Sequence, residues 1–181
     1  SEEEFSNELE SLHEKIKETK VPLSYYEILF VLFVTLATKK INPHKKNIFL
    51  LEVGVGGRLD CINFFDASMV LVTSLSRDHQ DLLGSRYREI LREKLGLLRS
   101  NSILLTNFHL NYLQVETKRF LNDHNIMLKD WIKIPQREDF SLGNKLLAKK
   151  AAAIFLSEKE LLSYDLELKS YSGRGDALQL K

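Results

Sequence analysis

Residues 47–63 read NIFLLEVGVGGRLDCIN, and this stretch decides the fold that the sequence predicts. Its apolar run, Ile48–Leu51, is followed by Glu52 and then by glycines from Gly54 onward. A short apolar run that leads into a glycine-rich turn is typical of a buried strand entering a tight loop. In open α/β sheets ligands bind beyond the carboxyl ends of the strands. Functional side chains are therefore expected from Glu52 onward.

The loop after Glu52 has two interpretations, a ligand-binding loop or a plain turn. Glycines allow backbone N–H groups to approach a ligand closely, and Arg58 and Asp60 add hydrogen-bonding side chains. A carboxylate at the end of a strand can also hold a metal ion. Glycine-rich loops also occur, less often in this context, as simple connections, and this stretch alone leaves both interpretations open.

The composition excludes several classes of protein. The chain has 181 residues, with 26 basic and 25 acidic side chains and a formal net charge of +1. This length suggests one domain, and the balanced charge favours neither nucleic acid nor anionic lipid as a partner. A single cysteine, Cys61, excludes an internal disulfide and fits a reducing compartment. The acidic N-terminus and the absence of a long apolar run predict a cytoplasmic protein without a membrane segment.

Strands alternate with helices along the chain. Besides Ile48–Leu51, strands are predicted at 68–74, 103–105 and 126–134, and helices at 1–18, 24–39, 85–98, 111–121 and 144–156. Residues 157–160 are expected to cap one more short turn. The 24–39 helix is apolar on nearly all sides, which predicts that it is buried. The alternation predicts an α/β fold with a mainly parallel sheet and helices on both faces.

One face of the helix predicted at 85–98 is apolar except for a lysine. Spacings of three and four residues place six side chains on this face: Tyr87, Ile90, Leu91, Lys94, Leu95 and Leu98. An unpaired ammonium among apolar neighbours is costly. Either the stem of Lys94 covers apolar surface while its head reaches water, or the lysine has altered chemistry. A depressed pKa or a covalent modification near a metal would be of the second kind.

Two further polar segments are candidates for a site. His79 follows the 68–74 strand and Glu52 follows the strand before it, so the two can approach one another at one end of the sheet. A carboxylate oxygen with an imidazole nitrogen suits Mg²⁺ or Mn²⁺. A lone histidine such as His79 is more often a hydrogen-bonded loop residue than a metal ligand. The first turn of the 24–39 helix, Ser24–Glu27, is either a cap with two core tyrosines or a ligand-facing helix start.

Separated motifs occur in a fixed order along the chain. Glu-Val-Gly-x-Gly-Gly-Arg-Leu-Asp spans 52–60, Thr-Ser-x-x-x-Asp-His-Gln spans 73–80, Leu-Gly spans 83–84, and Ile-x-x-Glu-Lys-x-Gly spans 90–96. Together they resemble the dihydrofolate synthase/folylpolyglutamate synthase family, which are ATP-dependent amide ligases of the Mur ligase superfamily. The resemblance implies an incomplete central ATPase domain at 1–163. It also implies a linker at 164–181 toward a C-terminal glutamate-binding domain.

The resemblance implies a role for each candidate residue. Glu52 and His79 are similar to the family's Mg²⁺ ligands. Lys94 is similar to the lysine that reacts with CO₂ to form a carbamate, which is an anionic oxygen ligand. These three are the implied catalytic and metal-binding residues. Asn144 and Arg174 match an adenine-side asparagine and an arginine that reaches the nucleotide phosphates. The residues that resemble the pteroate-binding positions are Ser24, Tyr25, Tyr26, Glu27, Leu59, Asp60 and Cys61.

The reaction implied by the resemblance joins L-glutamate to dihydropteroate or to folate polyglutamate tails, with ATP and Mg²⁺ as cofactors. A substrate carboxylate attacks the γ-phosphate of ATP, and the glutamate amine then displaces phosphate from the acyl phosphate. The sequence departs from the family at Cys61-Ile62 and at Ser76-Arg77. No Gly-x-x-x-x-Gly-Lys-Ser/Thr phosphate loop occurs in the chain. An internal piece of a longer ligase, without ATP turnover of its own, is therefore expected.

Two other classes compete with this interpretation. A methyltransferase also has an acid-x-Gly-x-Gly motif after a strand, but its next strand usually ends in an acidic residue, and here that strand ends in Thr73-Ser74. A non-catalytic module of the same fold would bind nucleotide or pterin weakly, or would only pack against the remainder of the parent ligase. Ligand binding separates these classes.

Overall fold

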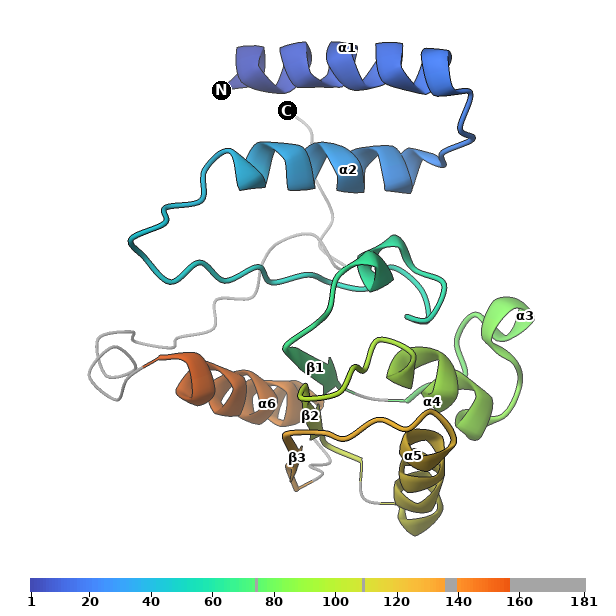
Figure 1. Cartoon of the computed structure of the whole chain (residues 1–181). Coiled ribbons are helices and arrows are strands. Elements are labelled where there is room, and N and C mark those ends of the chain that lie inside the picture. Colours follow the sequence, from blue (N-terminus) through green and yellow to red (C-terminus); the bar gives the residue numbers. More distant parts are fainter. Residues whose placement is uncertain (74, 109, 136–139, 157–181) are drawn as a thin grey trace, which may run out of the picture.

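The computed structural model describes residues 1–73, 75–108, 110–135 and 140–156. Figure 1 shows two parts, a pair of helices at one end and a sheet with its own helices at the other. An irregular segment connects the two parts. The expected turn at 157–160 and the expected boundary between residues 163 and 164 lie outside the described residues.

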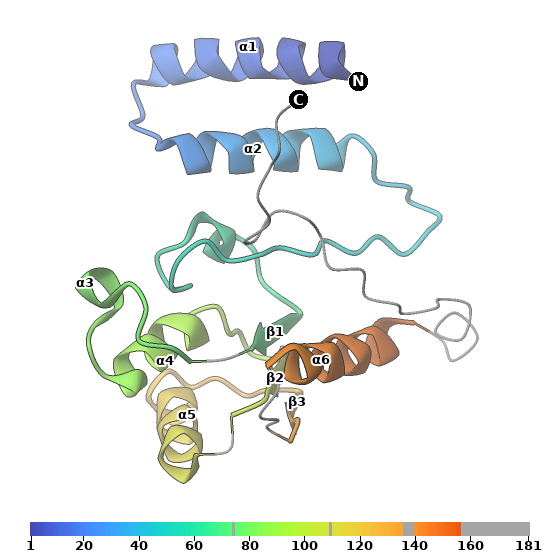
Figure 2. The same cartoon turned by 180° about the vertical axis from the view of Figure 1, so that it is seen from behind.

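The pair of helices is formed by α1 (Glu2–Thr19) and α2 (Tyr25–Thr38). Each begins at a serine whose side chain accepts a hydrogen bond from the backbone N–H of the third helical residue, with a glutamate returning the bond. This capping box satisfies backbone donors that a helix start otherwise leaves free. The helices lie antiparallel and side by side (Figures 1 and 2), and Lys40 and Glu4 form an ion pair of 3.4 Å between the ends of the hairpin. The helix predictions at 1–18 and 24–39 are confirmed.

The predicted burial of α2 is wrong. Leu32 is the buried residue of this helix, whereas Tyr25 is 77% exposed and Phe33 is 46% exposed. The helix contacts α1 on one side and the short 3₁₀ helix η1 (Cys61–Phe64) on another. In the described part of the chain these two neighbours cover only part of an all-apolar helix, and the rest of its surface faces solvent.

The predicted buried strand at Ile48–Leu51 is also wrong. This segment has no regular secondary structure, and Ile48 is 50% exposed while Leu50 is 90% exposed. A strand is stable only when its backbone N–H and C=O groups pair with a neighbouring strand. Among the described residues the sheet ends at β1, so no ladder extends to this apolar run.

The sheet has three parallel strands in the order β1-β2-β3, formed by Met69–Val72, Ile103–Thr106 and Asp130–Lys133. In the register of the first pair Met69 lies opposite Ile103, and Ile103 in turn lies opposite Asp130. Each strand lies inside its predicted range or extends one residue past it, and β3 covers only the second half of the predicted 126–134. The prediction of a parallel sheet is confirmed.

Helices cover both faces of this sheet, as predicted. Figures 1 and 2 agree that α6 (Phe140–Phe155) lies on one side, and that α4 (Tyr87–Leu95) and α5 (Asn111–Asp123) lie on the other. The short helix α3 (Gln80–Leu83) has no counterpart in the sequence prediction. Helix α6 begins at Phe140 instead of Asn144. The α/β fold with helices on both faces is therefore confirmed.

The main core lies between the sheet, α4 and α5. Leu91, Leu95 and Leu104 are each 0% exposed, and Leu113 is 2% exposed. Burying one such leucine contributes about 2 kcal/mol to stability. The apolar face predicted for the 85–98 helix is thus confirmed, since Ile90, Leu91, Leu95 and Leu98 are all buried. In the described residues, no helix has the length and apolar character needed to cross a membrane.

Candidate functional site

The glycine-containing loop 52–60 is closed by its own aspartate. The Asp60 carboxylate accepts hydrogen bonds from the backbone N–H groups of Gly54 at 2.9 Å, Val55 at 3.3 Å and Ile62 at 3.0 Å. A carboxylate that accepts several N–H bonds replaces the solvent that these donors would otherwise need. Asp60 therefore has a structural role in the loop, at the position where the resemblance implies a substrate contact.

One glycine of the loop and one at the end of α4 are required by the close packing of the loop on that helix. Gly57 has φ of +149°, and a Cβ added there would lie 2.8 Å from the carbonyl oxygen of Glu93. On the facing helix, a Cβ added to Gly96 would lie 2.5 Å from Cβ of Arg58. Real Cβ atoms do not approach other atoms this closely, so both positions need glycine for steric reasons. The motif thus places the loop directly against the helix that carries Lys94.

Arg58 fixes the loop to the same helix by two bonds. Its Nε lies 2.9 Å from Oε1 of Glu93, and its backbone N–H donates to the Glu93 carbonyl oxygen at 2.8 Å. Arg58 and Asp60 therefore have separate partners, one on α4 and one within the loop. Sequence reasoning missed Glu93 as the partner, because the two residues stand 35 positions apart. The signal for Asp60 was present, since an aspartate directly before a helical turn is a typical N-cap.

Tyr26 brings the start of α2 onto this loop. Its hydroxyl donates to the backbone oxygen of Glu52 at 3.4 Å, and a Cβ added to Gly54 would lie 3.1 Å from its Cζ. Partial burial, with the charges of Asp60 and Cys61 as lesser causes, raises the pKa of the Tyr26 phenol. Burial and the adjacent Asp60 likewise raise the pKa of the Cys61 thiol to about 11. The structure thus brings Tyr26, Asp60 and Cys61 together, and their role in substrate binding stays a prediction.

A groove of about 270 Å³ lies beside this cluster. Apolar side chains make up most of its wall, and Glu52 contributes a carboxylate. A mostly apolar groove with one charged group can hold a flat organic molecule in a defined orientation. Its lining residues are Tyr26, Leu29, Phe30, Phe33, Leu50, Leu51, Glu52 and Ile62.

Of the seven predicted substrate residues, only Tyr26 lines the groove. Asp60 and Cys61 lie in the cluster beside it, and four others remain. Ser24 and Glu27 bond to one another at 2.6 Å in the helix cap, and the hydroxyl and backbone of Ser24 lower the pKa of Glu27. Tyr25 is 77% exposed and Leu59 is 80% exposed. The cap explains Ser24 and Glu27 without a ligand, and a role for any of the four in substrate binding stays a prediction.

The three predicted metal ligands lie on three separate segments. Lys94 is half-buried on α4, and burial lowers its pKa against an opposing effect of Asp78. His79 is exposed in a left-handed conformation, with φ of 52°, and its backbone N–H donates to Asp78 at 2.9 Å. Glu52 is exposed. Within the described residues no hydrogen bond or ion pair joins any two of the three, and their joint role stays a prediction.

Within the described ranges, no group of three or more His, Cys, Asp and Glu side chains is arranged as a metal site. The expected site differs from such a group, because its third ligand is a modified lysine. Its donor set of carboxylate oxygen, imidazole nitrogen and carbamate oxygen has the chemistry that Mg²⁺ and Mn²⁺ accept. The residues present therefore fit the metal by donor type.

Asn144, the predicted adenine-side residue, has an unusual environment on α6. Its Oδ1 atom is buried and has no hydrogen-bond partner among the described residues. Such an acceptor is rare in folded proteins, and each case needs a reason. The preceding Gly143 approaches Asn107, which directly follows β2, so Asn144 lies near the carboxyl edge of the sheet. An N–H group of a bound ligand could donate the hydrogen bond that Oδ1 of Asn144 lacks. Arg174 lies outside the described residues.

Comparisons with known proteins support the resemblance over part of the chain. No family model matches. The dihydrofolate synthase/folylpolyglutamate synthase of Haemophilus influenzae is 39% identical over 80 residues, which is 44% of this chain and 17% of that protein. The protein of the same name from Escherichia coli is 50% identical over 54 residues, 30% of this chain and 13% of that protein. The chain spans less than a fifth of the length of these relatives.

Solved structures agree with this result. Escherichia coli FolC in complex with DHPP and ADP has 30% identity and a TM-score of 0.50, over 60% of this chain and 25% of that one. A Yersinia pestis bifunctional folylpolyglutamate synthase/dihydrofolate synthase with AMPPNP and Mn has 26% identity and a TM-score of 0.55, over 72% and 30% of the two chains. The fold alone matches a mutant L. casei FPGS, at 15% identity and a TM-score of 0.65, over 82% and 43%. The chain is therefore a partial homologue of dihydrofolate synthase/folylpolyglutamate synthase.

Proposed function

We propose that the chain is part of a cytoplasmic ATP-dependent carbon–nitrogen ligase that joins L-glutamate to dihydropteroate, to folate polyglutamate tails, or to both. The observation that carries the proposal is the groove at which Tyr26 and Glu52 meet, beside a loop that has the family's motif. We further propose that residues 1–163 form a partial central ATPase domain and that 164–181 lead toward a glutamate-binding domain.

The groove is proposed as the site of the flat pteridine-containing substrate. Tyr26 offers an aromatic ring for stacking, and Phe30 and Phe33 add apolar area. The Tyr26 hydroxyl is protonated at neutral pH, and burial raises its pKa further, so it can act as a hydrogen-bond donor. The volume of about 270 Å³ is near the lower end of the range for small-molecule pockets, which suits one fused ring system.

The nucleotide is proposed to bind at the carboxyl edge of the sheet. There the unpaired Oδ1 of Asn144 would accept a hydrogen bond from the exocyclic amino group of adenine. Arg174 would reach the phosphates. Glu52, His79 and carbamylated Lys94 would hold Mg²⁺, which neutralises phosphate charge during phosphoryl transfer.

The half-buried position of Lys94 supports its carbamylation. A lowered pKa raises the fraction of neutral amine, which is the form that attacks CO₂. A bond forms between Nζ and the carbon of CO₂, and the nitrogen loses a proton to water. The product is an anionic carbamate, so the free-energy cost of a partly buried Lys94 ammonium is removed.

The proposed reaction proceeds in two steps. A substrate carboxylate attacks the γ-phosphorus of ATP, and the bond to ADP breaks. The amine of glutamate then attacks the acyl carbon, phosphate leaves, and the amine proton passes to solvent. The groove and the sheet edge would hold the two reactants in fixed positions, which is the main contribution of a protein to phosphoryl transfer. A phosphate loop occurs nowhere in the sequence, so we expect no ATP turnover by these 181 residues.

Substrate binding tests the proposal on the chain as it is. We expect dihydropteroate to bind, as measured by calorimetry, and Tyr26→Leu to weaken binding about tenfold through the loss of ring stacking. Phe5→Leu is the matched control, because Phe5 on α1 is 43% exposed and Tyr26 is 44% exposed. Equal affinity of the two variants, or no binding at all, would contradict the proposed substrate site.

A second experiment tests the proposed nucleotide site by measuring how tightly the Asn144→Leu variant binds ADP. If Oδ1 accepts from adenine, this variant should bind ADP at least tenfold more weakly and should distinguish adenine from guanine nucleotides less well. The alternative, a non-catalytic module of this fold, predicts ligand binding without phosphate release when the missing parts of a ligase are supplied in trans. ATP-dependent ligation by the 181 residues alone would refute the expectation of inactivity.

A further inference from the structure

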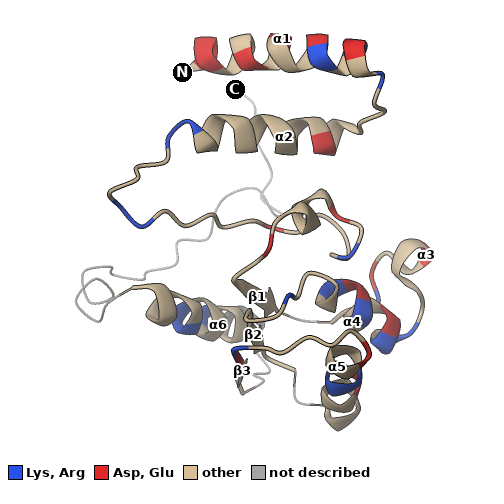
Figure 3. Cartoon of the chain, in the orientation of Figure 1, with Lys and Arg blue, Asp and Glu red and all other residues tan. Residues whose placement is uncertain are grey.

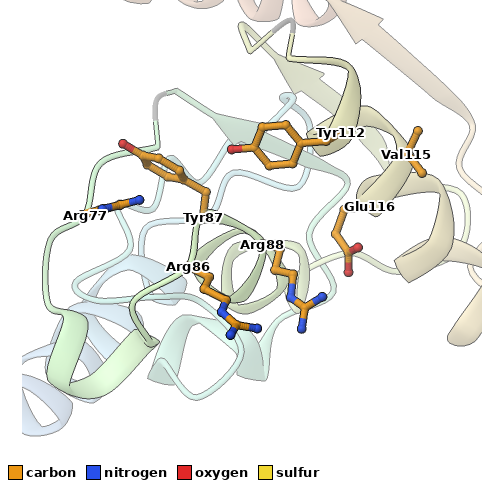
Figure 4. A pocket seen from close by; sticks show the side chains of 7 residues that line it. All are labelled: Arg77, Arg86, Tyr87, Arg88, Tyr112, Val115 and Glu116. Carbon is orange, nitrogen blue, oxygen red and sulfur yellow. The ribbon is translucent and has the colours of Figure 1, made fainter.

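A second pocket, of about 520 Å³, lies beside α4 and α5. Figure 4 shows its wall, which comes from three segments: the loop before α3, the start of α4, and α5. Arg77 comes from the loop, Arg86 and Arg88 from the start of α4, and Tyr112 from α5. None of the residues predicted for the ligase site lines this pocket.

The pocket gathers a particular set of arginines. Arg58, Arg92, Arg99 and Arg119 each form an ion pair with a carboxylate. Arg77, Arg86 and Arg88 form none, and with those four they are all the arginines in the described ranges. Every arginine of that part of the chain that lacks a carboxylate partner therefore lines the same pocket. Arginines on a mixed surface usually find acidic neighbours, so three unneutralised guanidinium groups at one hollow form a positively charged site.

The carboxylate in the pocket wall does not neutralise these charges. Glu116 is 7% exposed and forms ion pairs with Arg92 and, at 3.7 Å, with Arg119. Figure 4 shows the side chains of Arg86 and Arg88 extending in the same direction, with the rings of Tyr87 and Tyr112 away from their guanidinium ends. The guanidinium groups of neighbouring arginines can bind the oxygens of one anion by paired hydrogen bonds.

The tyrosines make the other wall. The guanidinium carbon of Arg77 lies 5.2 Å from the centre of the Tyr87 ring, which holds this arginine by a cation–π contact. Tyr112 is 49% exposed, and its hydroxyl points toward Tyr87 in Figure 4. A phenol hydroxyl can donate to an anion oxygen, so the tyrosines add donors without adding negative charge.

We propose that this pocket binds a small phosphate-bearing anion. Phosphate oxygens match the fork of an arginine side chain, and a doubly charged group is attracted by the positive charges of the three arginines that line the pocket. The volume falls within the range of small-molecule sites. A nucleic acid would need basic side chains along a track, whereas the chain has a formal net charge of only +1 and the unpaired arginines are confined to this hollow.

Pyrophosphate titration at constant ionic strength tests the proposal. Backbone amide NMR shifts should move for residues 77–88 and 112–116, and the double variant Arg86→Gln/Arg88→Gln should weaken binding at least tenfold. The matched control is Lys15→Gln/Lys17→Gln, two exposed lysines of α1 whose removal changes the net charge equally. The control should bind pyrophosphate like the unchanged chain. Circular dichroism spectra of both variants should coincide with that of the unchanged chain, since all four side chains lie at the surface.

Three results would overturn the inference. The first is no saturable shift at the pocket residues, and the second is equal loss of affinity in the arginine and lysine variants, which would indicate a general charge effect. The third is binding of single-stranded RNA at least a hundredfold more tightly than pyrophosphate, with shifts that extend well beyond the pocket. That result would identify a nucleic-acid surface in place of a small-anion site.

Discussion

The sheet with α4 and α5 differs sharply from the N-terminal helices and the segment that follows them. The first region buries a row of leucines completely, including Leu91, Leu95 and Leu104. In the second, α2 and residues 48–51 are at least as apolar, yet Leu32 is the only buried hydrophobic residue before Ile62. Figure 3 shows the same contrast in charge, because α2 is almost free of charged residues while α4 and α5 carry many.

This difference shows that apolar sequence alone does not determine burial. A buried side chain needs neighbours on every side, and the sheet region provides them through two helices and three strands. The N-terminal region has apolar side chains in excess of the surface that its described neighbours cover. Exposed apolar area of this kind marks a surface suited to contact. Stability should therefore depend strongly on residues of the first region and weakly on residues of the second.

The largest effect is expected for Leu91→Ala. Leu91 is 0% exposed, so its truncation should leave a cavity and lower the free energy of unfolding by about 3 kcal/mol. Leu29→Ala on α2 is the matched change, and because Leu29 is 37% exposed it should cost less than about 1 kcal/mol. Urea unfolding measures both. Similar losses for the two variants would show that the N-terminal region is as well packed as the sheet region.

Cys61 lies where the two regions meet, and its reactivity reports on that junction. Since its pKa rises from 9.0 to about 11, the thiolate fraction at pH 8 should be about a hundredfold lower than in the unfolded chain. Alkylation by iodoacetamide should therefore be slow at pH 8 in the folded protein, and should rise until the pH exceeds about 11. Because its pKa is raised, the folded state favours the protonated thiol. This contribution to the stability of the fold is complete below pH 9 and is lost as the pH rises from 9 to about 11. Equal alkylation rates in water and in urea would mean that the junction is open.

Gly57→Ala tests the contact between the loop and α4. The left-handed backbone and the 2.8 Å approach to the Glu93 carbonyl oxygen should cost about 2 kcal/mol. Gly143→Ala is the control, because this glycine lies inside α6, and a Cβ there would lie 3.3 Å from the side chain of Asn107. Alanine has a better helix propensity than glycine, which offsets the tighter contact with Asn107. The net change in the free energy of unfolding for Gly143→Ala should therefore be under about 1 kcal/mol. A melting temperature for Gly57→Ala equal to that of the control would remove the steric reason for the motif.

The smallest effect is expected for Arg58→Gln. The ion pair with Glu93 is partly exposed, so breaking it should cost less than about 1 kcal/mol, and 1 M salt should reduce that difference. Lys40→Gln breaks the ion pair with Glu4 in the other region and should show an equally small loss. Thermal melts at low and high salt measure both. A loss above about 2 kcal/mol for Arg58→Gln would mean that the side chain does more than pair with Glu93.

The sequence predicted the elements that have strong local signals. The caps at Ser1 and Ser24, the apolar face around Lys94, and the strands at 68–74 and 103–105 were found because each depends on residues a few positions apart. The strand at 48–51 was wrong, because an apolar run does not reveal whether a neighbouring strand will pair with it. The groove at Tyr26 and the Arg58–Glu93 bond join residues far apart in the chain, and neither has a local signature.

Asp60 has a consequence for any phosphate-bearing ligand. The backbone N–H groups of Gly54 and Val55 point to its carboxylate, and those of Arg58 and Asp60 itself point to carbonyl oxygens of Glu93 and Gly57. These four donors already have acceptors inside the protein, so they are not available to an anion. The negative carboxylate at the centre would moreover repel a phosphate. These four N–H groups therefore stabilise the loop itself, and a triphosphate would have to be bound by other donors.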